Sequence, residues 1–307
     1  MSIWAASWLW IPITIWAAFA QTVRNAAQRS LTTELGTLGA TLVRFLYGLP
    51  FAAAWLLLVL EGGGFAAPAP NLAFLSWGAC GALTQIAATA FLLAAMAERN
   101  FALGVAWSKT EILQVALFGT LLLGDPLTPL TLIAVLLATA GVLLFSKPAG
   151  GKPLSALLAG WTSRAALLGL ASGAAFAISA VGYRGAALAL APAPPVVGAA
   201  YTLVGAMALQ VVLLGGWLLL RNPAVIVATV RAWRASLLAG MMGAMASAGW
   251  FTAMAMQPVA HVRTLGLVEL LFSYVVSRRI FGERLSGTEL AGLALLALGL
   301  VGVVNAG

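Results

Sequence analysis

Charged residues are scarce in this sequence: they make up 8% of its 307 positions. A water-soluble domain of that length could not solvate its surface with so few charges. Cysteine and histidine are scarcer still, with one of each, Cys80 and His261. An internal disulfide and a His/Cys metal cluster are therefore excluded, and a Walker-type GxxxxGK[ST] loop for ATP is absent as well. We expect neither a metal nor a cofactor.

Apolar residues, in contrast, make up 62% of the sequence. They fall in runs of about 18 residues or more, long enough to cross the hydrocarbon of a bilayer as helix. The short alternating segments of an outer-membrane barrel are absent. The pattern predicts an all-α integral membrane protein with ten transmembrane helices, at 4–27, 38–60, 72–97, 102–123, 128–146, 164–189, 195–220, 235–257, 263–281 and 286–304.

The longest polar interruption, SKPAGGKP at 146–153, divides these helices into five and five. We therefore predict a first five-helix repeat over 1–146, a connecting loop over 147–163 and a second five-helix repeat over 164–307. Because each half has an odd number of helices, the second half must enter the membrane from the opposite side. The consequence is a pair of inverted repeats.

Residue matches between the halves support this repeat. Sliding the chain by 158 positions brings Glu111 onto Glu269 (269 − 111 = 158). In the same register, two glycines match as well, Gly124 with Gly282 and Gly141 with Gly299. In a chain with eight acids, a glutamate match in register with two glycines is hard to assign to chance.

Two similar turns follow the glutamate-bearing helices, GDPLT at 124–128 and GERLS at 282–286, and each leads into an apolar helix with a late glycine. Further residues of the same pattern are Trp16, Arg24, Arg44 and Phe45. With the five-plus-five helices, this pattern resembles the EamA-type branch of the drug/metabolite transporter superfamily. The resemblance implies a secondary active transporter that works by alternating access and exports small metabolites, amino acids or amphipathic compounds.

One departure from the family concerns the fourth and ninth helices, where the family often has a proline after a glutamate. Here Glu111 and Glu269 are followed by Ile112 and Leu270. A proline-bent helix is therefore not expected from the resemblance at either position.

The cations indicate membrane topology rather than a nucleic-acid partner. Most of them lie in the odd-numbered connections, and the even-numbered connections hold little beyond Arg263. By the positive-inside rule, the odd connections are cytoplasmic and both termini lie outside. The family resemblance implies cytoplasmic termini, so the orientation stays open. We expect the chain in a bacterial inner membrane, in contact with lipid, and topology accounts for its net charge of +8.

Three ionisable residues lie inside predicted helices: Lys109, Glu111 and Glu269. A charge at the centre of a membrane helix costs about 2.5 to 3.5 kcal/mol on insertion scales. On one continuous helix, Lys109 and Glu111 would point about 200° apart and could not neutralise each other. Either the charges belong to a structural network, for instance Glu111 with Arg44, or both glutamates face a water-filled cavity near the midplane.

The matched positions of the two glutamates favour a central cavity between the repeats, where a small-molecule substrate and protons bind. Because burial disfavours the charged form of a carboxylate, Glu111 and Glu269 are the expected proton-coupling residues, at which protonation and substrate compete. The helix face of Glu111 adds a polar and aromatic wall. The candidate substrate-binding residues are Trp16, Gln21, Arg44, Gln85, Trp107, Lys109, Glu111, Gln114, Trp250 and Glu269.

The rival interpretation is a polytopic membrane enzyme or a lipid-handling protein, with Glu111 and Lys109 as acid and base. It has little support, because the sequence contains no HExxH motif, no Cys/His pair and no acidic metal cluster. We therefore expect a transporter and not an enzyme.

Overall fold

The computed structural model describes residues 8–97, 107–145, 162–272 and 287–306. About 87% of these residues are helical and none of them forms a strand, which confirms the all-α prediction for this part of the chain. Five helical stretches in it are long and apolar enough to cross a membrane: Glu34–Gly63, Leu72–Leu92, Arg164–Ala189, Pro195–Arg221 and Trp233–Met256. Three shorter apolar helices cover Glu111–Leu123, Pro129–Leu144 and Leu290–Ala306. These lengths and compositions are consistent with a membrane protein.

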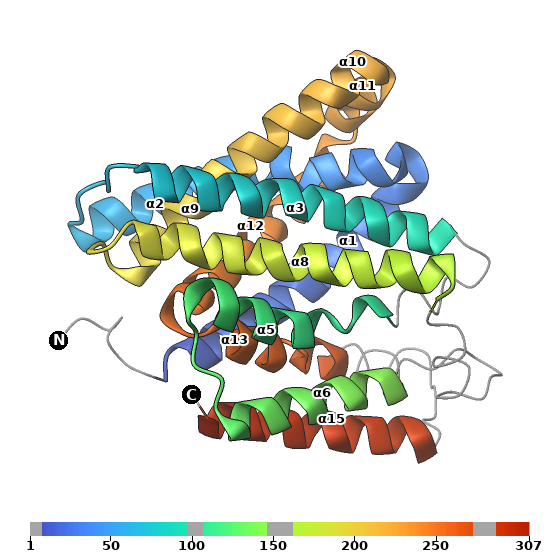
Figure 1. The fold of residues 1–307 in the computed structure, drawn as a ribbon. Helices are drawn as coiled ribbons and strands as arrows, with labels where there is room; N and C mark the ends of the chain where they lie inside the picture. The colour runs from blue at the N-terminus through green and yellow to red at the C-terminus, as the bar shows by residue number, and fades with distance from the viewer. Residues whose placement is uncertain (1–7, 98–106, 146–161, 273–286, 307) are drawn as a thin grey trace. The chain divides into compact units, whose positions relative to one another are not determined.

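Figure 1 shows the order of the helices along the chain. Their bounds are α1 Trp10–Leu46, α2 Leu49–Gly63, α3 Leu72–Ala97, α5 Glu111–Leu123, α6 Pro129–Phe145, α8 Arg164–Ala189, α9 Pro195–Gln210, the π-helical segment η2 Val211–Gly215, α10 Gly216–Arg221, α11 Pro223–Arg231, α12 Trp233–Met256, α13 Val259–Leu265 and α15 Gly287–Ala306. Helices α3 and α8 have the predicted bounds, and α6, α12 and α15 lie within two residues of theirs. The short helix α11 was not predicted.

Proline and glycine mark several of these helix ends. Pro195 and Pro223 open α9 and α11, where the missing N–H of proline leaves no hydrogen bond unmade. Gly124 ends α5 with a φ of 68°, a left-handed conformation that glycine adopts without steric cost. Gly124 therefore determines where α5 ends and the following turn begins.

The chain divides into two compact units, and each combines two segments that are separated in the sequence. The first unit consists of Met1–Ala82 and Gly182–Met256, and the second of Leu83–Val181 and Gln257–Gly307. Helices α3 and α8 contribute residues to both units. These units describe spatial contacts, whereas the predicted halves describe a sequence repeat, so the predicted repeat boundaries stay a prediction.

In the first unit, α1 reverses its direction at Gly36, whose φ of 66° and ψ of 177° are non-helical. The Gln28 side-chain amide donates to the Ala40 carbonyl at 2.8 Å across this reversal. Leu31 packs with Val43 in a buried cluster that also includes Ala239 of α12. Burial of Leu31 explains why the first helix continues past residue 27, where the sequence prediction ended it.

In the second unit, α6 and α15 lie side by side with their backbones in close approach (Figure 1). A methyl group on Gly141 of α6 would lie 2.5 Å from the backbone nitrogen of Leu296. A methyl group on Gly299 of α15 would lie 2.7 Å from the Cβ of Ala138. Glycine at both positions therefore allows a close contact, and any larger residue there would force the two helices apart.

Candidate functional site

The predicted fourth helix, 102–123, is interrupted in the second unit just before Glu111. Lys109 and Thr110 form a turn, and α5 begins at Glu111. The Thr110 backbone N–H bonds the Trp107 carbonyl at 3.2 Å, and the Thr110 hydroxyl donates to the same carbonyl at 2.7 Å. A tight turn of this kind, with a side-chain hydrogen bond to the backbone, replaces the hydrogen bonds of a regular α-helix. The prediction of one continuous helix was wrong, and the angle of about 200° between Lys109 and Glu111 does not apply.

A similar interruption precedes Glu269. Helix α13 ends at Leu265, a turn occupies 266–267, and the chain is helical again from residue 268. The Glu269 backbone N–H bonds the Gly266 carbonyl at 3.1 Å. The predicted ninth helix, 263–281, is therefore interrupted at 266–267, and its part after 272 lies outside the described residues. Each glutamate thus lies in the first turn after an interruption, although no proline follows either of them.

Glu111 forms an ion pair with Arg263, which reaches it from α13. The side chains of Arg263 and Glu111 keep 24% and 14% of their surface accessible, so the pair is largely but not completely buried. Glu111 lies in the first turn of α5 and Arg263 in the last turn of α13. An acid at a helix N-terminus and a base at a C-terminus are each stabilised by the backbone dipoles. Each helix end thus favours the charge that it carries.

Close packing holds the break before Glu111 against α8. A methyl group on Gly173 would lie 3.0 Å from both the Ser108 carbonyl oxygen and the Gln114 side-chain nitrogen. That Gln114 nitrogen donates to the Thr110 hydroxyl at 3.0 Å. Gln114, predicted as a ligand contact, therefore stabilises the turn from which Glu111 emerges.

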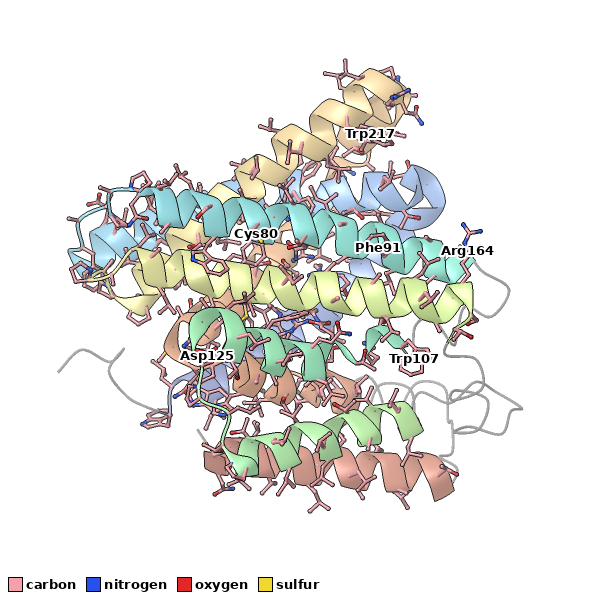
Figure 2. All side chains as sticks on the ribbon, viewed as in Figure 1. Cys80, Phe91, Trp107, Asp125, Arg164 and Trp217 are labelled. Atoms are coloured by element: carbon pink, nitrogen blue, oxygen red, sulfur yellow. The ribbon has the colours of Figure 1, made fainter. Side chains whose placement is uncertain are left out.

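A polar network fixes the other end of α13. The imidazole Nε2 of His261 lies 2.9 Å from the hydroxyl of Thr131 at the start of α6, and both residues are buried. The carboxylate of Asp125, in the connection after α5, accepts the backbone N–H of Val259 at 3.4 Å. Trp107 and Asp125 lie toward opposite ends of α5 in Figure 2. Two polar contacts therefore anchor the helix that carries Arg263.

The other candidates in the second unit are less closely tied to Glu111. The indole nitrogen of Trp107 is buried and has no hydrogen-bond partner among the described residues. Lys109 is half-buried and forms no ion pair within the described part of the chain. Gln85 lies half-buried in α3, and Glu269 is half-buried as well.

The first unit holds the remaining four candidates, along α1 and α12. The indole N–H of Trp250 donates to the Gln21 side-chain oxygen at 3.1 Å. The Arg44 guanidinium donates to the Ser247 hydroxyl at 3.4 Å, and its aliphatic stem passes Gly243. One face of α12 thus receives Gln21 and Arg44, both predicted, from α1.

Trp16, the fourth of these residues, lies apart from that cluster. It is 44% exposed and lines a cavity of about 450 Å³ in the first unit. The wall is almost entirely apolar and includes Phe51, Trp55 and Met245. The Trp16 ring therefore lies at an accessible apolar wall.

Sequence reasoning missed Arg263 as a member of the site. It was assigned to a connection between helices, whereas it lies within α13. One feature of the sequence indicates Arg263 as unusual: it is the main cation in the even-numbered connections, which are otherwise poor in positive charge. Among the described residues, no group of three or more His, Cys, Asp or Glu side chains could hold a metal ion.

Comparisons with known proteins identify the fold and no function. No family model matches the chain, and no curated protein matches it by sequence. A solved structure, described only as the crystal structure of a protein, is similar over 96% of this chain and 99% of its own. The two share 18% of their residues and superimpose with a TM-score of 0.67, so the likeness concerns the fold alone.

Proposed function

We propose that this chain is a secondary transporter of a small molecule, with ten transmembrane helices in two inverted five-helix repeats. The observation that carries the proposal is the Glu111–Arg263 pair at a helix interruption. Charges within apolar helices are costly and commonly mark pathways of ions or substrates. Interrupted helices are the usual site of substrate contact in transporters of this kind. Because both side chains keep some accessible surface, a ligand can reach the pair.

The close contact of α6 and α15 supports the inverted repeats. Gly141 meets Leu296, and Gly299 meets Ala138. Gly141 and Gly299 are 158 positions apart (299 − 141 = 158), and so are Ala138 and Leu296 (296 − 138 = 158). Reciprocal contacts of equivalent residues are the pattern that a two-fold relation between two bodies generates. This argument is independent of the glutamate match.

The class of substrate and the location follow from the family resemblance. On this basis the chain exports small metabolites, amino acids or amphipathic compounds across a bacterial inner membrane by alternating access. Proton coupling at Glu111 and Glu269 belongs to the same proposal. A membrane enzyme is less well supported, because Glu111 is paired with a guanidinium rather than free to act as an acid or base.

An efflux experiment with a mixture of solutes tests transport while the substrate is still unidentified. Proteoliposomes are loaded with a defined mixture of labelled amino acids, nucleosides and organic acids, and a pH gradient is imposed. Mass spectrometry then identifies the solutes that leave faster than from protein-free liposomes. When the same solutes are present outside at a higher concentration, we expect at least one of them still to leave unaltered, against its own gradient. A chemically altered solute would indicate an enzyme, and flux that never runs uphill would indicate a channel.

Two matched variants make this experiment specific to the site. Glu111→Gln should remove pH-driven efflux, because the side chain can no longer take up a proton. Glu61→Gln changes an exposed glutamate at the end of α2 and should transport as the unmodified protein does. Equal efflux by all three proteins would contradict a role of Glu111 in coupling.

A further inference from the structure

The cavity of about 450 Å³ in the first unit extends along the helices that form it. On the α1 side, its lining residues run from Leu9, the cap of the helix, to Trp16 (16 − 9 = 7), a rise of about 10 Å. On α12 they run from Ala244 to Thr252 (252 − 244 = 8), a rise of about 12 Å. Helix α2 adds two aromatic rings. The space is therefore elongated in the direction of the helices.

Small side chains on α12 create this space. Ala244, Ala248 and Gly249 all line it. A methyl group on Gly249 would lie 2.8 Å from the Cβ of Ala17, so α12 and α1 are in close contact there. Beside this contact, the two short alanine side chains leave the room toward α2 unfilled. Its size falls within the range of ligand sites, about 300 to 1,000 Å³.

The wall of the cavity favours an uncharged and apolar occupant. None of the described residues that line it is ionisable, and Thr252 adds a hydroxyl to walls formed mainly by apolar side chains. A charged group in this space would lose its hydration without gaining a counter-ion. The rings of Trp16, Phe51 and Trp55 offer flat apolar surface instead. Hydrocarbon therefore fits these walls, and a charged headgroup does not.

The rim of the cavity continues into an exposed apolar surface near the start of α1. The exposed ring of Phe19 lies 5.9 Å from the ring of Trp16, measured between centroids. Trp8, just before α1, is exposed as well, and tryptophan is enriched at the level of lipid headgroups. In a membrane, a cavity that extends about 10 Å along α1 from that level lies within one leaflet, whose hydrocarbon is about 15 Å thick. The opening then meets lipid chains.

Trp55 adds one polar requirement to this apolar space. Its Nε1 is buried and has no hydrogen-bond partner among the described residues. The ring packs against Val196 and Val197 in the first turn of α9, so it lies near a helix end. A buried donor without an acceptor is costly. The ester carbonyl that joins an acyl chain to the rest of a glycerolipid is an uncharged acceptor near the membrane interface.

We propose that this cavity binds one acyl chain of a membrane glycerolipid, whose ester carbonyl accepts a hydrogen bond from the Nε1 of Trp55. The chain lies along the small residues of α12, and the headgroup stays outside at the interface. The inference requires the protein to lie in a membrane, but it does not require transport. It assigns Trp16 to a lipid contact, whereas the sequence indicated a substrate contact.

Native mass spectrometry of the purified full-length protein tests the inference by counting bound lipids. The protein is delipidated in a mild detergent and titrated with a diester phosphatidylethanolamine. We expect one lipid to bind more tightly than any further ones. Glycerophosphoethanolamine, which is the headgroup without its chains, should not bind.

Photocrosslinking locates the bound chain without any substitution. The same lipid with a diazirine in one acyl chain is added to the unmodified protein and irradiated. Peptide mapping should find the crosslinks at cavity residues of α1 and α12, such as Ile13, Trp16 and Met245.

Three variants assign binding to the cavity. Ala248→Leu fills the space and should weaken binding of the first lipid at least tenfold. Ala235→Leu adds the same side chain at an exposed position of α12 and should bind as the unmodified protein does. Trp55→Phe should weaken binding of the diester lipid about fivefold, the effect of one neutral hydrogen bond. It should leave binding of the diether lipid, which lacks the carbonyl, unchanged. Size-exclusion profiles establish that each variant is folded.

Several results would overturn the inference. They are failure of the unmodified protein to retain a lipid, equal lipid affinity of the unmodified protein and Ala248→Leu, or crosslinks that all lie outside the cavity. Displacement of the lipid by N-acetyltryptophanamide, a water-soluble aromatic compound, would indicate a small-molecule pocket instead. A dimer that Ala248→Leu dissociates would mean that a second copy covers the cavity. An equal effect of Trp55→Phe on both lipids would refute the hydrogen bond. Efflux of a solute by a protein that binds no lipid would refute this inference and leave the transport proposal intact.

Discussion

The two compact units manage their buried polar residues in different ways. In the first unit, Trp250 and Gln21 form a hydrogen bond between neutral groups. The sequence of that unit contains two acids, Glu34 and Glu61, and both are exposed. In the second unit, Glu111 and Arg263 bring opposite full charges together beside a helix interruption.

This difference shows where the chemistry of a proton can act. The indole and the amide that form this hydrogen bond stay neutral at any physiological pH. An ion pair that includes a carboxylate changes its charge when a proton binds. On the proposed function, change that depends on a proton belongs to the ion pair of the second unit, and the hydrogen bond of Trp250 and Gln21 contributes to packing. Three substitutions can break or sharpen this distinction.

The largest effect is expected for Arg263→Gln. The substitution leaves the Glu111 charge without its partner at a largely buried position, which in a fully buried pair costs several kcal/mol. The remaining exposure of the pair reduces the expected loss to about 2 kcal/mol. Thermal unfolding in detergent measures it. Arg231→Gln, at an exposed position at the end of α11, is the matched control. Recovery of stability in the double variant Glu111→Gln/Arg263→Gln would identify the unpaired charge as the cause.

A smaller loss is expected for Gly173→Ala. The added methyl group would lie 3.0 Å from the Ser108 carbonyl oxygen and would push on the turn before Glu111. Overpacking of this kind costs about 1 to 3 kcal/mol, partly offset by the higher helix propensity of alanine. The control is Gly216→Ala in α10, where a methyl group meets nothing within 4 Å. An equal unfolding temperature for both variants would mean that α8 does not constrain the break.

The smallest effect is expected for Trp250→Phe, which keeps an aromatic ring and removes the hydrogen bond to Gln21. A neutral hydrogen bond contributes about 1 kcal/mol, with a spread of about half that value. Trp233→Phe, at a 51% exposed position, controls for the general loss of an indole. If Trp250→Phe abolished pH-driven efflux while leaving stability intact, the distinction between the units would fail.

The long helices could be predicted because their ends are visible in the sequence. Helices α3 and α8 were predicted at their observed bounds, with the glycine- and proline-rich segment 61–71 before α3. Hydrophobic run length is sufficient for such helices. The unpredicted α11 is nine residues long, well below the length that a spanning run requires.

The interruptions before Glu111 and Glu269 could not be predicted from run length. Thr110 breaks its helix through one hydroxyl bond to Trp107, and threonine is common within helices that do not break. The partner of Glu111 was missed for a related reason. Arg263 is separated from Glu111 by 152 positions, and positive charge near helix ends was assigned to topology. Pairing across such a distance depends on the fold, which periodicity alone does not determine.

The α6–α15 contact has a consequence for the origin of the proposed architecture. Because Gly141 and Gly299 make equivalent contacts with each other's helix, the contact surface is complementary to itself. On the proposed topology, two separate copies of one five-helix polypeptide, inserted in opposite orientations, could associate through that same surface. Gene fusion would then only have had to join the two subunits of a pre-existing homodimer. The equivalent of Arg263 in the first half is Val105 (263 − 105 = 158). A later divergence of these two positions would have made the halves unequal.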